Sequence, residues 1–169
     1  MRRILVIGNS GGGKSTLARK LGEKLGLPVI HLDVLFWKPG WVESDRDDYR
    51  ARVVQALAAP EWICDGNFTS TFGMRMALSD TIIWIDRPRL LCLFRAIKRA
   101  ITYRGGGRPD MAEGCVEKVD FGFYRFILTY DRKVRPKLEA ALAEHGAHAR
   151  RVRLRTDREV AAFLVSAMR

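Results

Sequence analysis

The sequence predicts an α/β fold in which a five-stranded parallel sheet is covered by helices on both faces. Five short apolar runs alternate with helical patterns along the 169-residue chain. This alternation favours parallel strands, since each parallel connection needs a crossover segment that is usually a helix. Chains of about 100–200 residues commonly form one domain with a complete core, so we expect residues 1–169 to be a single domain.

The individual elements follow from the residue patterns in chain order. Residues 4–7 form a continuous apolar run, which is typical of a strand buried on both faces of a parallel sheet. Apolar residues then recur at helical spacing from Leu17 to Leu25. The other expected strands are 29–32, 62–64, 81–85 and 149–154. The expected helices are 14–25, 45–58, 90–102, 118–144 and 157–168, the last with Thr156 as its N-cap.

A complete phosphate-binding loop lies between the first expected strand and the first expected helix. The pattern G-x-x-x-x-G-K-[ST] is formed by Gly8, Asn9, Ser10, Gly11, Gly12, Gly13, Lys14 and Ser15, and Thr16 follows it. The glycines let consecutive backbone N–H groups point at phosphate oxygens, and the helix adds its positive N-terminal end. In this pattern the lysine reaches the β- and γ-phosphates and the serine binds Mg²⁺.

We therefore expect residues 8–16 to bind ATP, with Lys14 as a catalytic residue and Ser15 as a ligand of Mg²⁺. A chance glycine-rich turn is the alternative interpretation. The buried strand before the loop and the amphipathic helix after it favour the phosphate-binding interpretation, because this context is the one in which the loop works.

Two carboxylates follow expected strands. Asp65 comes directly after strand 62–64 and precedes Gly66, which allows a sharp turn. Since ligands of open α/β sheets bind at the carboxyl ends of the strands, we expect the Asp65 carboxylate to lie near Mg²⁺ as a second protein oxygen group besides the Ser15 hydroxyl. Asp33 ends strand 29–32 in the same way and is expected to accept the proton of an attacking hydroxyl or to orient the acceptor. A turn or capping role is the alternative for each.

Arginines follow the fourth expected strand. Arg95 and Arg99 are four residues apart and therefore lie on one face of helix 90–102, where fixed positive charge stabilises a transferring phosphoryl group. Three glycines and a proline interrupt regular structure over 103–117. With Arg104 and Arg108, this segment is expected to be a mobile lid that closes over the nucleotide. A solvated arginine face and an ordinary surface loop are the alternatives.

The charge balance favours a polyanionic partner. The chain has 30 Lys and Arg against 19 Asp and Glu, which gives a net charge of +11. Near the end of the chain Arg151, Arg153 and Arg155 alternate with apolar residues. This alternation predicts an edge strand with one charged face, because charged side chains there prevent unwanted strand pairing; contact with nucleic acid is the alternative.

Other residue types exclude several classes of protein. The three cysteines are few and widely separated, which favours reduced thiols that pack in the interior over disulfides or a zinc site. The three histidines show no metal-ligand spacing. No apolar stretch approaches the roughly 18 residues of a membrane span, and the N-terminal apolar run is too short for a secretory signal. We therefore expect a cytoplasmic protein without a membrane partner.

Several segments resemble known proteins. The phosphate loop, the strand end Asp65-Gly66, and Ile85-Asp86-Arg87-Pro88 before an arginine-bearing helix are similar to the adenylate kinase branch of the P-loop kinases. Four segments resemble the bacterial family described as DNA topology modulation proteins: Ile30-His31-Leu32-Asp33, Phe36-Trp37-Lys38-Pro39-Gly40-Trp41, Asp65-Gly66-Asn67 and Arg108-Pro109-Asp110-Met111-Ala112-Glu113-Gly114-Cys115. The resemblance covers nearly the whole chain and implies an adenylate-kinase-like P-loop NTPase fold with the strand order 2-3-1-4-5.

The resemblance also implies roles for single residues. Arg95 matches the arginine that covers the nucleotide base, and Arg99 matches the one that contacts phosphate. Asp65 matches the aspartate that holds the water shell of Mg²⁺. Asp33 matches the aspartate at the start of the monophosphate-binding region.

Two departures from the adenylate kinase pattern concern the acceptor. The two arginines that hold the acceptor monophosphate in adenylate kinases are replaced here by Phe36 and Thr69. Arg46, Arg50 or Arg75 could substitute from other positions. A buried phosphate dianion binds poorly without charge-assisted partners, so AMP is not the expected acceptor.

The sequence thus predicts an ATP- and Mg²⁺-dependent kinase that transfers the γ-phosphoryl group to a small-molecule or nucleotide acceptor. Asp33, Asn67 and Trp37 are expected to contact that acceptor, Trp37 together with Trp41 by stacking, although both tryptophans could instead pack their loop. The alternative is an ATP-binding, DNA-associated protein that affects DNA topology, as the family description implies. The sequence has no recognisable helix-turn-helix, zinc or aromatic nucleic-acid motif in support of that alternative.

Overall fold

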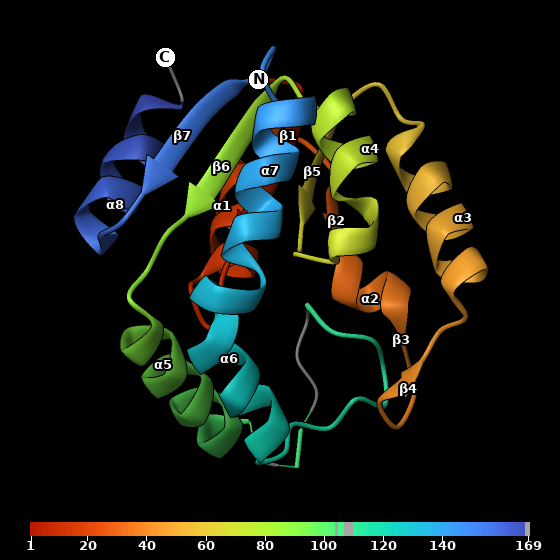
Figure 1. The fold of residues 1–169 in the computed structure, drawn as a ribbon, viewed down its shortest axis with the longest axis vertical. Helices are drawn as coiled ribbons and strands as arrows, with labels where there is room; N and C mark the ends of the chain where they lie inside the picture. Colours follow the sequence, from red (N-terminus) through yellow and green to blue (C-terminus); the bar gives the residue numbers. More distant parts are fainter. Residues whose placement is uncertain (104, 107–109, 168–169) are drawn as a thin grey trace.

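The central feature of the fold is a five-stranded parallel sheet (Figure 1). The computed structural model describes residues 1–103, 105–106 and 110–167. The strands lie in the order β2-β5-β1-β6-β7, which is 2-3-1-4-5 when only the strands of this sheet are numbered. They span β1 Arg3–Gly8, β2 Val29–His31, β5 Trp62–Asp65, β6 Thr81–Ile85 and β7 Arg150–Leu154. The predicted fold class and strand order are confirmed.

Helices connect these strands and one short hairpin precedes the third helix. The helices are α1 Lys14–Leu25, α2 Leu32–Phe36, α3 Arg46–Leu57, α4 Phe72–Leu78, α5 Arg89–Thr102, α6 Phe121–Lys133, α7 Arg135–His145 and α8 Asp157–Ser166. A 3₁₀ turn, η1, covers Thr69–Thr71, and the hairpin consists of β3 Trp37–Lys38 and β4 Val42–Glu43. The helices predicted at 14–25, 45–58, 90–102 and 157–168 agree with α1, α3, α5 and α8 to within a few residues.

The sheet has a hydrophobic core on each face because successive strand residues point to opposite sides. In β1, Ile4 and Val6 belong to the core shared with α1 and α8, whereas Leu5 and Ile7 belong to the core shared with α3, α4 and α7. In Figure 1, α4 and α7 lie in front of the sheet and α1 lies behind it. Helices therefore cover both faces, as the continuous apolar strands predict.

The predicted helix 118–144 is wrong, because two helices occupy this stretch. The first, α6, ends at Lys133, Val134 lies between the helices, and α7 begins at Arg135. Pro136 explains the break, since a proline has no N–H for an intrahelical bond and its ring clashes with the carbonyl four residues earlier. At the N-terminus of α8, the predicted N-cap Thr156 is confirmed, since its hydroxyl accepts a hydrogen bond from the Glu159 N–H at 3.1 Å.

Short elements on the cleft side were not predicted. Residue Leu32, expected at the end of a strand, instead begins α2, and neither α4 nor the β3–β4 hairpin was expected.

The three cysteines are free and buried, as predicted for packing residues. Among the residues that the structure describes, no helix combines the length and the apolar character needed to cross a membrane.

Candidate active site

A cleft of about 1680 Å³ lies at the carboxyl ends of the central strands. Its wall includes residues 10–16 of the phosphate loop, the α2 residues Asp33 and Phe36, part of α3, the 66–71 segment, and Arg95 and Arg99 of α5. Ligand pockets commonly measure about 300–1,000 Å³. The cleft is therefore large enough for a nucleotide and a second small molecule side by side.

The phosphate loop has the geometry of an anion cradle. A Cβ on Gly11 would lie 2.2 Å from the carbonyl oxygen of Cys92, so only glycine fits at this close approach to α5. Gly13 has a φ of 98° and provides no side-chain cap for α1. Apart from Gly13 and its two chain neighbours, no described atom lies within 4 Å of the position that a Cβ on Gly13 would take. This open side of the loop lies at the N-terminus of a 12-residue helix, whose first N–H groups have no partner within the helix and suit phosphate oxygens.

Lys14 lies among charged groups at the floor of this cradle. Its Nζ donates to the Asn9 carbonyl oxygen at 3.1 Å. Burial lowers the pKa of Lys14, while the negative charges of Asp65 and Asp33 oppose that shift. Both predicted carboxylates therefore act on the same ammonium group, as expected of residues at one edge of the sheet.

Two asparagine side chains hold the loop in place. Asn67 forms a two-point contact with the peptide of Gly8: its Oδ1 accepts from the Gly8 N–H at 3.2 Å, and its Nδ2 donates to the Gly8 carbonyl at 2.7 Å. Asn9 donates through Nδ2 to the Ile127 carbonyl of α6 at 3.0 Å. Asn67 lines the cleft, but its amide is engaged by Gly8, so its contact with an acceptor stays a prediction.

Asp65 is paired with a histidine that sequence reasoning did not select. The His31 Nδ1 and the Asp65 Oδ1 are 2.6 Å apart, and Asp65 is only 3% exposed. His31 lines the cleft, whereas Asp65 is not among the lining residues. Burial lowers the pKa of His31, but the hydrogen bond and charge of Asp65 outweigh burial and raise it above its ordinary value.

The donors near the loop fit Mg²⁺ in chemical type. The Ser15 hydroxyl and the Asp65 carboxylate are oxygen groups, and Mg²⁺ is held through one or two protein oxygens together with substrate phosphates and water. Within the described part of the chain, no cluster of three His, Cys, Asp or Glu side chains forms a protein-only metal site.

Two arginines of α5, and Arg87 just before this helix, are paired with carboxylates beside the cleft. Arg95 Nη2 lies 2.8 Å from Asp157 Oδ2, and Arg87 Nη2 lies 2.7 Å from Asp157 Oδ1. Arg99 Nε lies 3.1 Å from Glu117 Oε1, and its guanidinium is 5.8 Å from the Phe123 ring centroid. Arg95 and Arg99 both line the cleft, as their spacing on one helix predicts. The partners Asp157 and Glu117 were not predicted.

The predicted lid is described only in part. Arg104 and Arg108, to which the lid prediction gave a role, lie outside the described residues. Residues 110–117 form an irregular segment beside the β3–β4 hairpin. Three hydrogen bonds join this segment to the hairpin: the Gly40 N–H donates to the Gly114 carbonyl at 3.1 Å, Trp41 Nε1 to the Val116 carbonyl at 2.7 Å, and Cys115 Sγ to the Lys38 carbonyl at 3.3 Å. The mobility of residues 103–117 stays a prediction.

Of the three arginines suggested as partners of an acceptor phosphate, Arg46 and Arg50 line the cleft and Arg75 does not. Its side chain is fully buried and donates to the carbonyl oxygens of Gly66, Asn67 and Phe68 and to the Thr71 hydroxyl. The suggestion that Arg75 holds an acceptor phosphate is therefore wrong. Arg46 and Arg50 of α3 line the cleft with exposed side chains.

Solved structures with a similar fold include two shikimate kinases and a gluconokinase. Shikimate kinase from Acinetobacter baumannii in complex with shikimate has a TM-score of 0.58 and 14% identity, over 98% of this chain and 90% of that chain. Shikimate kinase from Bacteroides thetaiotaomicron has a TM-score of 0.55 and 17% identity, over 98% of this chain and 95% of that chain. A gluconokinase from Sinorhizobium meliloti 1021 has a TM-score of 0.55 and 17% identity, over 99% and 89%.

These similarities establish the P-loop NTPase type of α/β fold for this chain. No protein-family model matches the sequence, and no curated protein matches it. The specific resemblance to DNA topology modulation proteins therefore stays a prediction from the segments that carry it.

Proposed function

We propose that this protein is a phosphotransferase that moves the γ-phosphoryl group of ATP to the hydroxyl of a small-molecule or nucleotide acceptor other than AMP. The observation that carries the proposal is the single cleft that joins the phosphate loop to Asp33 and an aromatic acceptor half. The fold is also that of proteins named as shikimate kinase and gluconokinase. An ATP-binding cradle beside a second binding space is the arrangement that phosphoryl transfer needs.

The chemical step is a single displacement at phosphorus. The acceptor hydroxyl oxygen forms a bond to the γ-phosphorus, and the bond from that phosphorus to the oxygen bridging the β-phosphate breaks, which releases ADP. Asp33 takes the hydroxyl proton through its carboxylate. Lys14, Arg95 and Arg99 stabilise negative charge on the phosphoryl oxygens.

Ser15 and the water shell on Asp65 would hold Mg²⁺, which when bound neutralises charge on the β- and γ-phosphates. His31 fixes the Asp65 carboxylate through the 2.6 Å contact. We also propose that the 103–117 segment closes over the nucleotide and excludes water, which otherwise competes with the acceptor hydroxyl.

The test is ADP release from Mg-ATP across a panel of nucleoside monophosphates, nucleosides and hydroxylated metabolites. Lys14→Ala serves as the blank, and Lys98→Ala serves as the matched control because Lys98 is an exposed residue of α5 outside the cleft lining. One compound should accelerate ADP release in the wild type and in Lys98→Ala but not in Lys14→Ala. ATP turnover at the wild-type rate in Lys14→Ala would refute the proposal.

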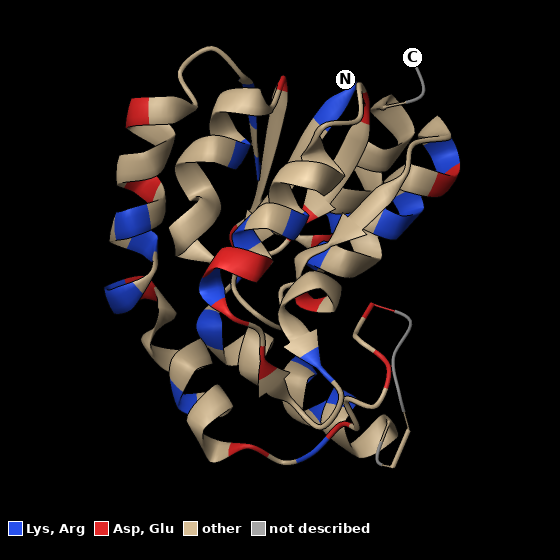
Figure 2. Cartoon of the chain, turned by 90° about the vertical axis from the view of Figure 1, so that its right-hand side faces the viewer, with Lys and Arg blue, Asp and Glu red and all other residues tan. Residues whose placement is uncertain are grey.

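The DNA-associated alternative has less support from the distribution of charge. Basic and acidic residues occur together on the helices α1, α3, α6, α7 and α8, whereas α5 and β7 carry only basic ones (Figure 2), and several arginines are paired within the protein. On the edge strand β7, Arg153 Nη2 lies 2.6 Å from Asp86 Oδ2, and Arg151 donates to the Gly146 carbonyl at 3.1 Å. The predicted charged edge strand is thus confirmed, and its arginines are directed partly at the protein itself.

A further inference from the structure

We propose that the acceptor carries its hydroxyl on a substituent of a planar, uncharged ring, and that this ring binds against an aromatic wall formed by Phe36, Trp37, Trp41 and Phe68. This inference rests on the proposed kinase function. All four rings line the cleft and all are partly exposed. They come from three separate pieces of chain: the end of α2 with β3, the tip of the hairpin, and the segment after β5.

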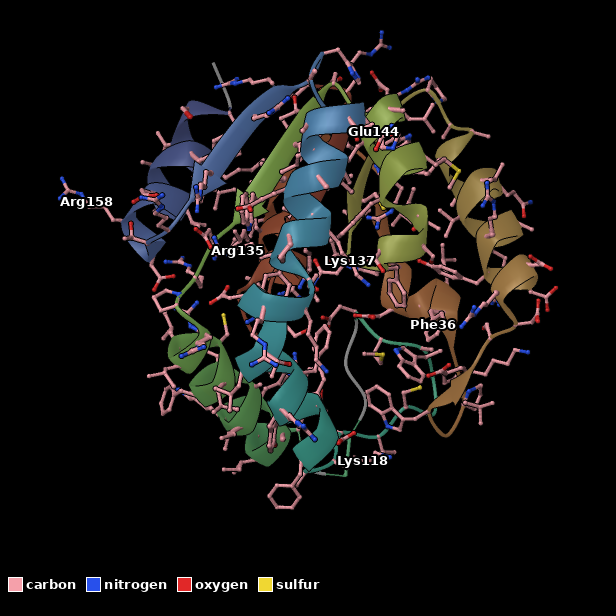
Figure 3. The ribbon with its side chains drawn as sticks, viewed as in Figure 1. Phe36, Lys118, Arg135, Lys137, Glu144 and Arg158 are labelled. Atoms are coloured by element: carbon pink, nitrogen blue, oxygen red, sulfur yellow. The ribbon has the colours of Figure 1, made fainter. Side chains whose placement is uncertain are left out.

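The rings of the wall contact one another in a continuous series. The ring centroids of Trp41 and Trp37 are 5.5 Å apart, those of Trp37 and Phe36 are 4.9 Å apart, and those of Phe36 and Phe68 are 4.7 Å apart. Figure 3 places Phe36 at the lower end of α2, next to the hairpin. Edge and tilted contacts of this kind fix the orientation of each ring. The wall is therefore a preformed surface, which loses little entropy when a flat ligand binds.

Backbone strain occurs at two positions of this wall. Among the residues that the structure describes, Trp41 and Phe68 are the non-glycine residues with positive φ, at 64° and 25°. Bulky residues rarely adopt this strained conformation, which is found mainly at functional sites. Both residues are held by their neighbours: Trp41 Nε1 donates to the Val116 carbonyl at 2.7 Å, and the Phe68 carbonyl accepts from Arg75 Nη2 at 3.0 Å. The fold thus stabilises two strained backbones that present rings to the cleft.

The charges around the wall favour an uncharged ligand. Phe36 and Thr69 stand where an acceptor phosphate would need arginines, and the buried Arg75 is committed to the 66–68 carbonyls. The rim formed by α3 and β4 carries balanced charges, which are Arg46 and Arg50 against Glu43 and Asp47. A rim without net charge has no preference for an anion.

Asp33 connects the wall to the reaction. Asp33 and Phe36 are three residues apart on α2, so their side chains share one face of the helix. A ring stacked at Phe36 therefore brings the group that carries the hydroxyl toward Asp33, which would take the proton as the oxygen attacks the γ-phosphorus. The ring could belong to a nucleoside or to a simpler heteroaromatic alcohol, and both have this chemistry.

An anionic polyol is the competing class of acceptor. Such a ligand would need a cation, and Lys137 of α7 lines the cleft beside Thr69 and Ser70. Figure 3 shows Lys137 near the start of α7, opposite α2 and α4. A polyol would depend on Lys137 and would be insensitive to loss of an indole ring, so the two classes give opposite results in the same variants.

The test separates binding from turnover. Tryptophan fluorescence of the Lys14→Ala protein is titrated with three groups of compounds: nucleosides, hydroxymethyl-substituted heteroaromatics, and the anionic polyols shikimate and gluconate. At least one compound of the first two groups should quench the fluorescence at saturable concentrations, and Trp37→Leu should remove most of that quenching. Which of the two groups contains it identifies the source of the ring.

Kinetics with that compound then test the wall. Trp37→Leu and Phe68→Leu should each raise its KM at least tenfold and change kcat less than threefold, whereas Phe94→Leu, an exposed α5 residue outside the cleft lining, should change neither. Circular dichroism confirms folding, and Trp37→Leu alone suffices if Phe68→Leu unfolds. Phosphorylation of polyols alone, abolished by Lys137→Met and retained in Trp37→Leu, overturns the ring proposal and leaves the kinase proposal standing. Saturable ring binding without Lys14-dependent ADP release refutes the kinase proposal instead.

Discussion

Replacement of Arg75 by methionine should destabilise the protein and loosen residues 66–68, which line the cleft. Arg75 is fully buried, and its guanidinium forms the hydrogen bonds that fix the carbonyls of Gly66, Asn67 and Phe68. Methionine has a similar length but no donor. The carbonyl oxygens would then lose their partner, and the contact of the guanidinium with the Phe72 ring, 5.1 Å away, would also be lost.

The magnitude follows from these contacts. An unsatisfied buried polar group costs about 1–3 kcal/mol, and loss of one partner from a buried charged network commonly costs about 3–5 kcal/mol. Removal of the guanidinium also ends its own desolvation, which lowers the pKa of Arg75 in the native protein. Because Asn67 and Phe68 are only partly buried, water can reach some of the carbonyls. We therefore expect a net loss of about 3 kcal/mol, at the lower end of the range for such networks.

Urea denaturation measures this loss, and Arg158→Met is the matched control. Arg158 extends from α8 into solvent (Figure 3). A loss of about 3 kcal/mol corresponds to a decrease in Tm of roughly 6–12 °C for a domain of this size. If Arg75→Met unfolds within 0.5 kcal/mol of Arg158→Met, the buried hydrogen bonds do not hold residues 66–68 and our account of them is wrong.

Three further predictions concern other contacts. Asp86→Asn should lose about 2 kcal/mol at pH 7: burial raises the Asp86 pKa, but hydrogen bonds from Arg153 and Arg135 outweigh it, and the net pKa is lowered. A lowered folded-state pKa stabilises the protein above the unfolded pKa of about 3.9, so the difference between the urea midpoints of variant and wild type should shrink as the pH falls below that value, and a constant difference contradicts this. Asn67→Ala should weaken ATP binding about tenfold, as measured by calorimetry, since the Gly8 backbone loses both of its contacts with the Asn67 side chain. An unchanged affinity would show that these two contacts do not hold the phosphate loop. Any duplex DNA binding should collapse between low and physiological salt while ATP binding persists, and salt-resistant duplex binding would favour the DNA-associated alternative.

The local part of the site could be predicted because its residues are adjacent in the chain. The phosphate loop, its strand and its helix occupy residues 3–25 without interruption. The pair Arg95 and Arg99 is likewise set by the period of a single helix. Periodicity failed where one residue overrides it, as Pro136 does between α6 and α7, and where an element is as short as α2.

The non-local part of the site depended on pairings between distant segments. His31 and Asp65 are 34 positions apart in sequence, yet they are register partners at the ends of the neighbouring strands β2 and β5. The predicted strand order already places these strands side by side, so this pair could have been found by comparison of their last residues. The ion pairs to Asp157 and Glu117 had no such signal, because both carboxylates lie on segments whose position depends on packing.

The irregular 110–117 segment connects the two halves of the cleft. On the acceptor side, backbone and indole contacts fix it to the hairpin that carries Trp41. On the nucleotide side, Glu117 forms the ion pair with Arg99 of α5. Displacement of the aromatic wall from Arg99 must therefore break contacts at one of these two joints. Under the proposed function, binding in either half of the cleft acts on the same segment, and we expect this segment to couple the aromatic wall to Arg99 without a direct contact between them.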